Sequence, residues 1–136
     1  MATALVPQPF PPGFNLVEGT KLSALFARHE LSTQYAASAT GTTAATGTAI
    51  TTSIVHFGTV VSGGYAILPQ ARAGLLITVF NGGAQTLNIA PQATTDVIDA
   101  GSVGAATTLS VANRVAQFFC ISPGRWISAL LGAVSS

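Results

Sequence analysis

The chain has 136 residues, of which 49% are hydrophobic and only 7% are charged, and its formal net charge is +1. This length suits a single domain, the one cysteine excludes an internal disulfide framework, and five scattered basic residues argue against binding nucleic-acid phosphates. Because a soluble domain typically has about 25% charged residues, we expect part of the surface to be buried against other protein copies.

Residues 1–14 are predicted to form an extended arm. Four prolines in this segment restrict φ and remove backbone donors, so neither a helix nor an interior strand can form. The segment also carries no charge, which favours an arm docked on a partner over the alternative, a solvated disordered tail. Its expected partner-contact residues are Leu5, Val6, Phe10 and Phe14. Without a basic start, and with these prolines, the segment is not a signal peptide.

Residues 20–31 are the one predicted helix. An apolar stripe runs along it at the i, i+3, i+4, i+7 spacing of one helix face. The stripe consists of Leu22, Leu25, Phe26 and His29. Thr20 is a suitable N-cap. We expect this short helix to cover one end of a sheet or to pack on a neighbouring subunit.

Residues 15–136 are predicted to form a single domain. Apart from the helix at 20–31, this domain is predicted to be β. The Ala/Thr-rich segment 36–49 has few large apolar side chains, so we expect a loop there that leads into a strand near 50–57. Short apolar runs separated by turn residues predict further strands. These runs are 65–68, 75–80, 85–90, 107–111, 114–121 and 125–131. About eight short strands at this spacing favour a jelly roll or a β-sandwich.

Two turns are predicted to close hairpins. Asn81-Gly82-Gly83 lies between apolar runs, and Asn-Gly tolerates the positive φ that a tight hairpin turn needs. Ser122-Pro123-Gly124 separates the last two predicted strands in the same way.

Two predicted strands, 75–80 and 114–121, are apolar on both faces. We expect Leu76 and Phe80, and likewise Phe118 and Cys120, to lie opposite the core residues of their strands. A sheet with two apolar faces must be covered twice, and another subunit is one way to cover the outer face. The partner-contact residues predicted in the β domain are Leu76, Phe80, Phe118 and Trp126.

No catalytic, cofactor-binding or metal-binding residues are predicted. Cys120 could pair with His29 or His56 as nucleophile and base, but the apolar neighbours of Cys120 favour a buried thiol.

Asp96 and Asp99 lack the surroundings of a sugar or calcium site and are expected to stabilise turns. No nucleophile elbow, phosphate loop or metal-ligand spacing occurs. The chain is therefore predicted not to be an enzyme.

A membrane location is also not expected. A spanning helix needs about 20 mostly apolar residues, and the longest apolar runs, within 75–80 and 118–121, are much shorter. A transmembrane barrel needs more and longer strands than this chain offers. We expect a soluble, unsecreted protein.

Several segments resemble the small virion proteins of tailed bacteriophages. In residues 73–89 an apolar strand runs into an Asn-Gly turn and a returning strand, and residues 96–101 and 116–126 follow in a similar order. Residues 15–22 resemble the segment that opens such proteins. The resemblance covers most of the chain, apart from 36–49, and implies a structural role in a capsid or tail without catalytic residues.

The expected function is that of a capsid decoration, or cement, protein. It would bind the major capsid protein on the outside of the virion as a homodimer or homotrimer, after assembly in the cytoplasm of the host bacterium. Two alternatives stay open. One is a tail or head-fibre component, and the other is a jelly-roll module that binds glycans through exposed aromatic side chains.

Overall fold

The computed structural model describes residues 32–111 and 114–132. All regular structure in this part of the chain is β, with ten short strands in two sheets. The all-β class is therefore confirmed, with more strands than the eight expected. The predicted arm at 1–14 and the predicted helix at 20–31 lie outside the described residues.

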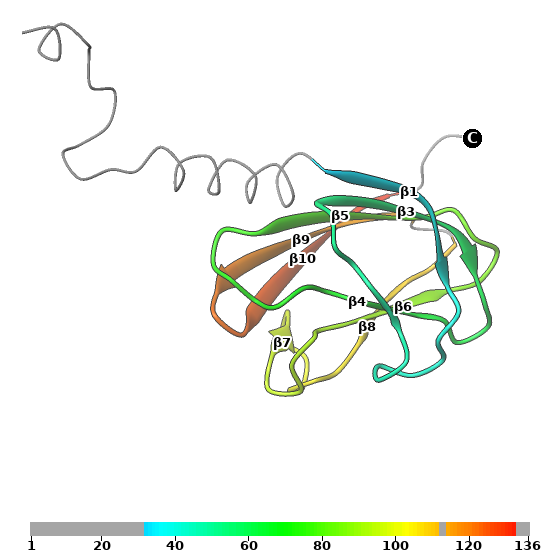
Figure 1. Cartoon of the computed structure of the whole chain (residues 1–136). Coiled ribbons are helices and arrows are strands. Elements are labelled where there is room, and N and C mark those ends of the chain that lie inside the picture. The colour runs from blue at the N-terminus through cyan, green and yellow to red at the C-terminus, as the bar shows by residue number, and fades with distance from the viewer. Residues whose placement is uncertain (1–31, 112–113, 133–136) are drawn as a thin grey trace, which may run out of the picture.

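The six-stranded sheet lies above the four-stranded sheet in Figure 1. In spatial order the larger sheet contains β1 (Thr33–Ala39), β3 (Ile54–Val60), β5 (Leu76–Asn81), β9 (Val115–Ser122), β10 (Arg125–Gly132) and β7 (Val97–Ile98). The smaller sheet contains β2 (Thr48–Ala49), β4 (Tyr65–Ile67), β6 (Leu87–Ala90) and β8 (Thr107–Leu109).

The first six strands alternate between the two sheets, so each return to a sheet adds a parallel neighbour. β1, β3 and β5 are parallel in the larger sheet, and β2, β4 and β6 are parallel in the smaller one. Most of the later pairings are antiparallel, namely β9 with β5 and β10, and β8 with β6, whereas β7 is parallel to β10. Both sheets are thus mixed, whereas a jelly roll is built from antiparallel Greek keys.

The two sheets enclose one hydrophobic core. Buried side chains from both sheets form it, because alternate residues of each strand point inward. The larger sheet contributes Val55, Phe57, Ile77, Val79, Ala116, Phe118 and Trp126, and the smaller sheet and its connections contribute Ala66, Leu68, Leu87, Ile89 and Leu109.

The predicted hairpin at Asn81-Gly82-Gly83 is wrong, because this turn carries the chain from β5 in one sheet to β6 in the other. The side chain of Asn81 is buried and holds the corner. Its Nδ2 donates to the carbonyls of Gln85 and Leu109, both at 2.9 Å, and its Oδ1 accepts from the N–H of Gly83 at 3.1 Å. The bond to Leu109 ties the corner to β8 of the smaller sheet.

The second predicted hairpin is confirmed. β9 and β10 are antiparallel neighbours joined by Ser122-Pro123-Gly124, with Arg125 opposite Ser122. Gly124 has φ +77°, a conformation that glycine adopts without a steric cost.

Segment 36–49 begins as a strand and not as the predicted loop. Ala37 and Ala39 in β1 are buried against the core, and the next strand of this sheet starts only at Ile54. The pairing of β1 with β3 is interrupted by a bulge near Ala36, which has φ +59°.

Candidate functional site

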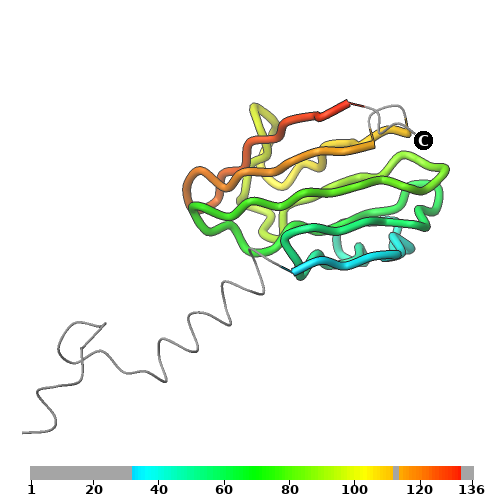
Figure 2. The backbone as a smooth tube through the Cα atoms, turned by 90° about the horizontal axis from the view of Figure 1, so that it is seen from above, coloured from blue at the N-terminus to red at the C-terminus, as the bar shows by residue number. Residues whose placement is uncertain are grey.

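The most distinctive surface is the outer side of the six-stranded sheet. Figure 2 looks down on this side, with β1 in cyan, β5 in green and β9 in orange. Pairing places Leu76 opposite Phe119 and Phe80 opposite His56 across neighbouring strands. We call the following six residues the apolar outer face: Tyr35, Ile54, Leu76, Phe80, Phe119 and Ile121.

The apolar outer face is partly open to solvent. The exposed fraction is 81% for Tyr35, 55% for Ile121, 39% for Ile54 and 38% for Phe119, while Leu76 and Phe80 are half-buried. No residue within β1, β3, β5 or β9 carries a formal charge. Exposed apolar side chains gathered on one face of a sheet are typical of an interaction surface.

The structure places only two of the four partner-contact residues predicted in the β domain on this face. Leu76 and Phe80 point outward as expected. Phe118 and Trp126 instead lie in the core, with exposed fractions of 1% and 0%. The four predicted contacts in the arm, Leu5, Val6, Phe10 and Phe14, lie outside the described residues.

The predicted face of strand 114–121 is wrong by one residue. Phe118 and Cys120 are buried, and it is Phe119 and Ile121 that point outward. Because apolar residues occupy both sides of this strand, alternation alone does not distinguish its inner from its outer face. The pairing of Ile77 with Phe118 decides the matter, since it puts both side chains on the core side of adjacent strands.

A stacked aromatic pair holds one edge of the apolar outer face. The rings of Tyr35 and His56 are 4.9 Å apart between centroids and tilted by only 12°. The imidazole also abuts Gly82, where a Cβ would clash with Nε2. The Nδ1 atom of His56 is buried and has no hydrogen-bond partner among the described residues. The imidazole is thus half-buried, and the ring of Tyr35 stacks on it.

The polar side chains in the middle of this face bond to each other. Thr78 and Gln117 are opposite one another on β5 and β9. Nε2 of Gln117 donates to Oγ1 of Thr78 at 3.4 Å. Because this bond partly satisfies both side chains, a partner can cover them without supplying polar atoms of its own at every position.

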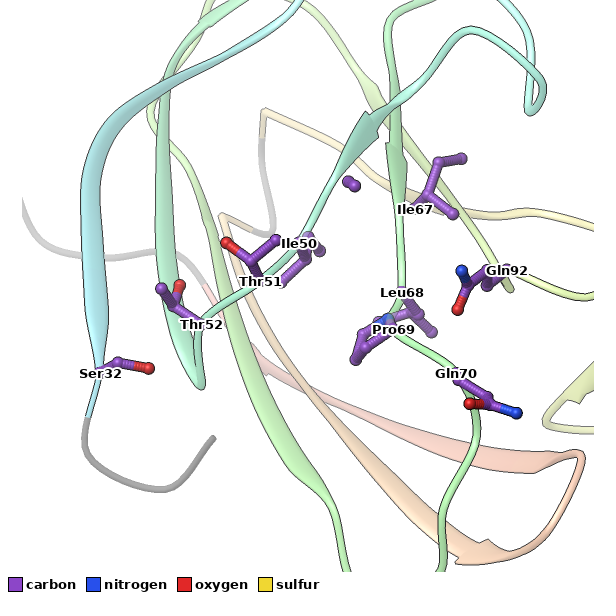
Figure 3. A pocket seen from close by; sticks show the side chains of 10 residues that line it. Ser32, Ile50, Thr51, Thr52, Ile67, Leu68, Pro69, Gln70 and Gln92 are labelled. Atoms are coloured by element: carbon purple, nitrogen blue, oxygen red, sulfur yellow. The ribbon is translucent and has the colours of Figure 1, made fainter. Parts of the chain in front are cut away.

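A second candidate site is an open groove of about 560 Å³. It lies between the segment that enters β3 and the segment that leaves β4, as Figure 3 shows. The described residues that line it are Ser32, Ala49, Ile50, Thr51, Thr52, Ile67, Leu68, Pro69, Gln70 and Gln92. None of these is charged and none is a histidine or cysteine, so the groove has no acid–base or metal-binding groups from this part of the chain.

The imagined pairing of Cys120 with His56 is not formed. Cys120 points into the core from β9, while His56 lies on the outer side of β3 with its ring on Tyr35. His29 lies outside the described residues. Within residues 32–111 and 114–132, no three His, Cys, Asp or Glu side chains are grouped so that they could hold a metal ion.

Asp96 and Asp99 serve local structure, as expected. The backbone N–H of Asp96 closes a turn by donating to the carbonyl of Ala93 at 3.1 Å, and its carbonyl accepts from the N–H of Gly104 at 2.7 Å. The carboxylate of Asp99 accepts from the backbone N–H of Ser128 at 2.7 Å and from its hydroxyl at 2.6 Å. Asp99 has φ +55°, which aspartate tolerates better than most residues. Its side chain therefore fastens the segment after β7 to β10.

Cys120 is expected to react slowly with thiol reagents in the folded protein. Burial raises the pKa of its thiol, and the nearby charge of Asp96 acts in the same direction. The reactive thiolate is therefore scarce at neutral pH, and the sulfur is shielded by the core. Labelling with a chromogenic disulfide reagent measures this directly, because the chain has a single cysteine. The rate should rise sharply in denaturant, and equal rates with and without denaturant would contradict the buried position.

Across the described part of the chain, no helix has the length and apolar character needed to cross a membrane. No protein-family model, curated protein sequence or solved structure matches the chain.

Sequence reasoning missed four residues of the apolar outer face: Tyr35, Ile54, Phe119 and Ile121. Alternation in β9 could not identify Phe119 and Ile121, because both faces of this strand are apolar and only the register with β5 distinguishes them. Tyr35 gave no signal either, because it precedes a segment predicted to be a loop.

Proposed function

We propose that the chain is a non-enzymatic structural protein of a bacteriophage virion. It decorates the outside of the capsid and stabilises it by bridging subunits of the major capsid protein. It acts as a homodimer or homotrimer, after assembly in the cytoplasm of the host bacterium. In the same proposal the two sheets form a β-sandwich.

The observation that carries this proposal is the apolar outer face, an uncharged sheet surface that no described element of the chain covers. Contact with water is unfavourable for such a surface, at about 25 cal/mol for each Å² of apolar area. Within an assembly, a neighbouring subunit covers the apolar outer face permanently. The resemblance of residues 73–89 and 116–126 to small virion proteins supports a viral shell as that assembly.

The proposed mechanism is multivalent binding. The proline-rich arm, residues 1–14, binds neighbouring capsid subunits through Leu5, Val6, Phe10 and Phe14, by adding backbone hydrogen bonds along an exposed strand edge. An oligomer presents two or three arms at once, so individually weak contacts combine. Because the decoration binds only the assembled shell, mass action favours the assembled state.

Deleting residues 2–14 tests this mechanism. We expect the truncated protein to bind purified shells at least about tenfold more weakly, because the deletion removes all arms of the oligomer at once. Binding is measured by co-sedimentation of full-length and truncated protein with shells of the phage that encodes the chain. Val103→Glu is a control that also changes an exposed apolar residue but leaves the arm intact. Undiminished binding of the truncated protein would show that the arm mechanism is wrong.

Electron microscopy of labelled protein in virions tests the location. Label distributed over the capsid supports the proposal. Label confined to the tail or to head fibres would favour the fibre alternative, and specific glycan binding without virion label would favour the glycan-binding module.

A further inference from the structure

We infer that the apolar outer face is the surface through which copies of this chain associate with each other. The inference builds on the proposed function, in which the protein acts as a small homo-oligomer, and it assigns the interface to the six-stranded sheet. Other parts of the surface then bind the capsid.

The size of the face fits a subunit interface. The four uncharged strands β1, β3, β5 and β9 have six to eight residues each. With strands about 4.8 Å apart and a rise of about 3.3 Å per residue, they cover a footprint of roughly 450 Å². The accessible area is larger than this planar footprint because side chains protrude. This size is nearest to the lower end of stable interfaces, which bury about 600 Å² per partner.

The chemistry of the face favours a second copy over a polar or charged partner. Interfaces between identical subunits are more apolar than other protein contacts and poor in charge at their centre. Here the central polar groups, Thr78 and Gln117, already bond to each other. A partner that brought charged groups to this surface would bury them unpaired, at a cost in free energy. Another copy of the same uncharged face brings no such cost.

The edges of the sheet argue for association through the face. β1 is an edge strand, but its bulge near Ala36 interrupts the regular pairing that an added strand would need. The opposite edge, β7, has only two residues. In Figure 1 no described element lies over the outer side of the sheet.

Tyr35 is the expected anchor of the interface. It is the most exposed large apolar side chain of the described residues, at 81%. Its stacking on His56 limits its conformational freedom before association. Rigid aromatic side chains of this kind contribute strongly to interfaces because little entropy is lost when they are buried.

Sedimentation velocity of the full-length chain tests the inference over a range of concentrations. We expect wild-type protein to sediment as a dimer or trimer of the 13.7 kDa chain. Ile121→Glu places a charge on the face and should raise the dissociation constant at least about tenfold, toward a monomer. Val103→Glu is the matched control, since Val103 is equally apolar and 67% exposed but lies in the loop between β7 and β8. It should leave the oligomer unchanged.

Tyr35→Glu is a second variant, so that the inference can still be tested if Ile121→Glu does not fold. It changes the most exposed residue of the face and removes no core contact. Circular dichroism verifies that each variant is folded. A wild-type chain that stays monomeric, or folded variants that keep the wild-type oligomer, would overturn the inference.

Shell binding, measured separately, distinguishes the two proposals. A monomeric wild-type chain that binds shells would overturn the interface and leave the proposed function standing. An oligomer that depends on Tyr35 and Ile121 but ignores shells would support the interface and contradict the proposed function.

Discussion

The Trp126→Ala substitution is expected to lower the free energy of unfolding by about 3–5 kcal/mol, the usual cost of truncating a large buried aromatic side chain. Trp126 is fully buried and lies opposite Cys120 in the core between the sheets. Since small domains are stable by only about 5–15 kcal/mol, this loss is a large part of the total. Chemical denaturation followed by circular dichroism measures the effect.

Trp126→Phe is the matched control for this prediction. It keeps most of the ring and removes the indole Nε1, a buried donor without a hydrogen-bond partner among the described residues. Relief of an unpaired donor offsets part of the lost volume, so the cost should be clearly smaller than that of Trp126→Ala. Equal losses for the two variants would contradict the argument from packing.

We expect Asn81→Ala to lower the free energy of unfolding by about 3 kcal/mol. The substitution removes three hydrogen bonds at the corner between the sheets. It leaves the N–H of Gly83 and the carbonyl of Leu109 without this partner in a buried environment, and each unpaired group costs about 1–3 kcal/mol. Thermal and chemical unfolding of the purified variant give the measurement.

Asn88→Ala provides the comparison at a second asparagine. Its Nδ2 makes one bond, to the carbonyl of Gly64 at 3.2 Å, and the backbone N–H of Asn88 donates to the same carbonyl at 2.9 Å. The carbonyl therefore keeps a partner, and the expected loss is only about 0.5–1 kcal/mol. If Asn88→Ala were as destabilising as Asn81→Ala, the corner would have no special role.

Local turn chemistry predicted one turn correctly and one wrongly, and the difference is physical. Ser122-Pro123-Gly124 joins strands that stay in one sheet, so local conformational preference and tertiary pairing agree. At Asn81-Gly82-Gly83 the same kind of turn preference is overridden by a long-range bond, from Nδ2 of Asn81 to Leu109. That bond joins residues 28 positions apart, which turn propensity does not take into account.

The candidate site was predicted in part for a related reason. Leu76 and Phe80 were assigned to the outer face because β5 alternates with inward Ile77 and Val79. β9 is apolar on both sides, so its inner face depends on its register with β5. Tyr35 joined the site only because β1 pairs with β3 and places it on His56.

The sequence by itself determined that this is an all-β domain with little charge, turns at its glycines and more apolar surface than its core needs. These properties depend on composition and on short-range patterns, which local physics controls. Only the tertiary structure decided which sheet each strand joins and which apolar residues stay exposed. Both depend on strand pairings between distant residues, such as Ile77 with Phe118, whose energies come from packing in the core and not from neighbours in the chain.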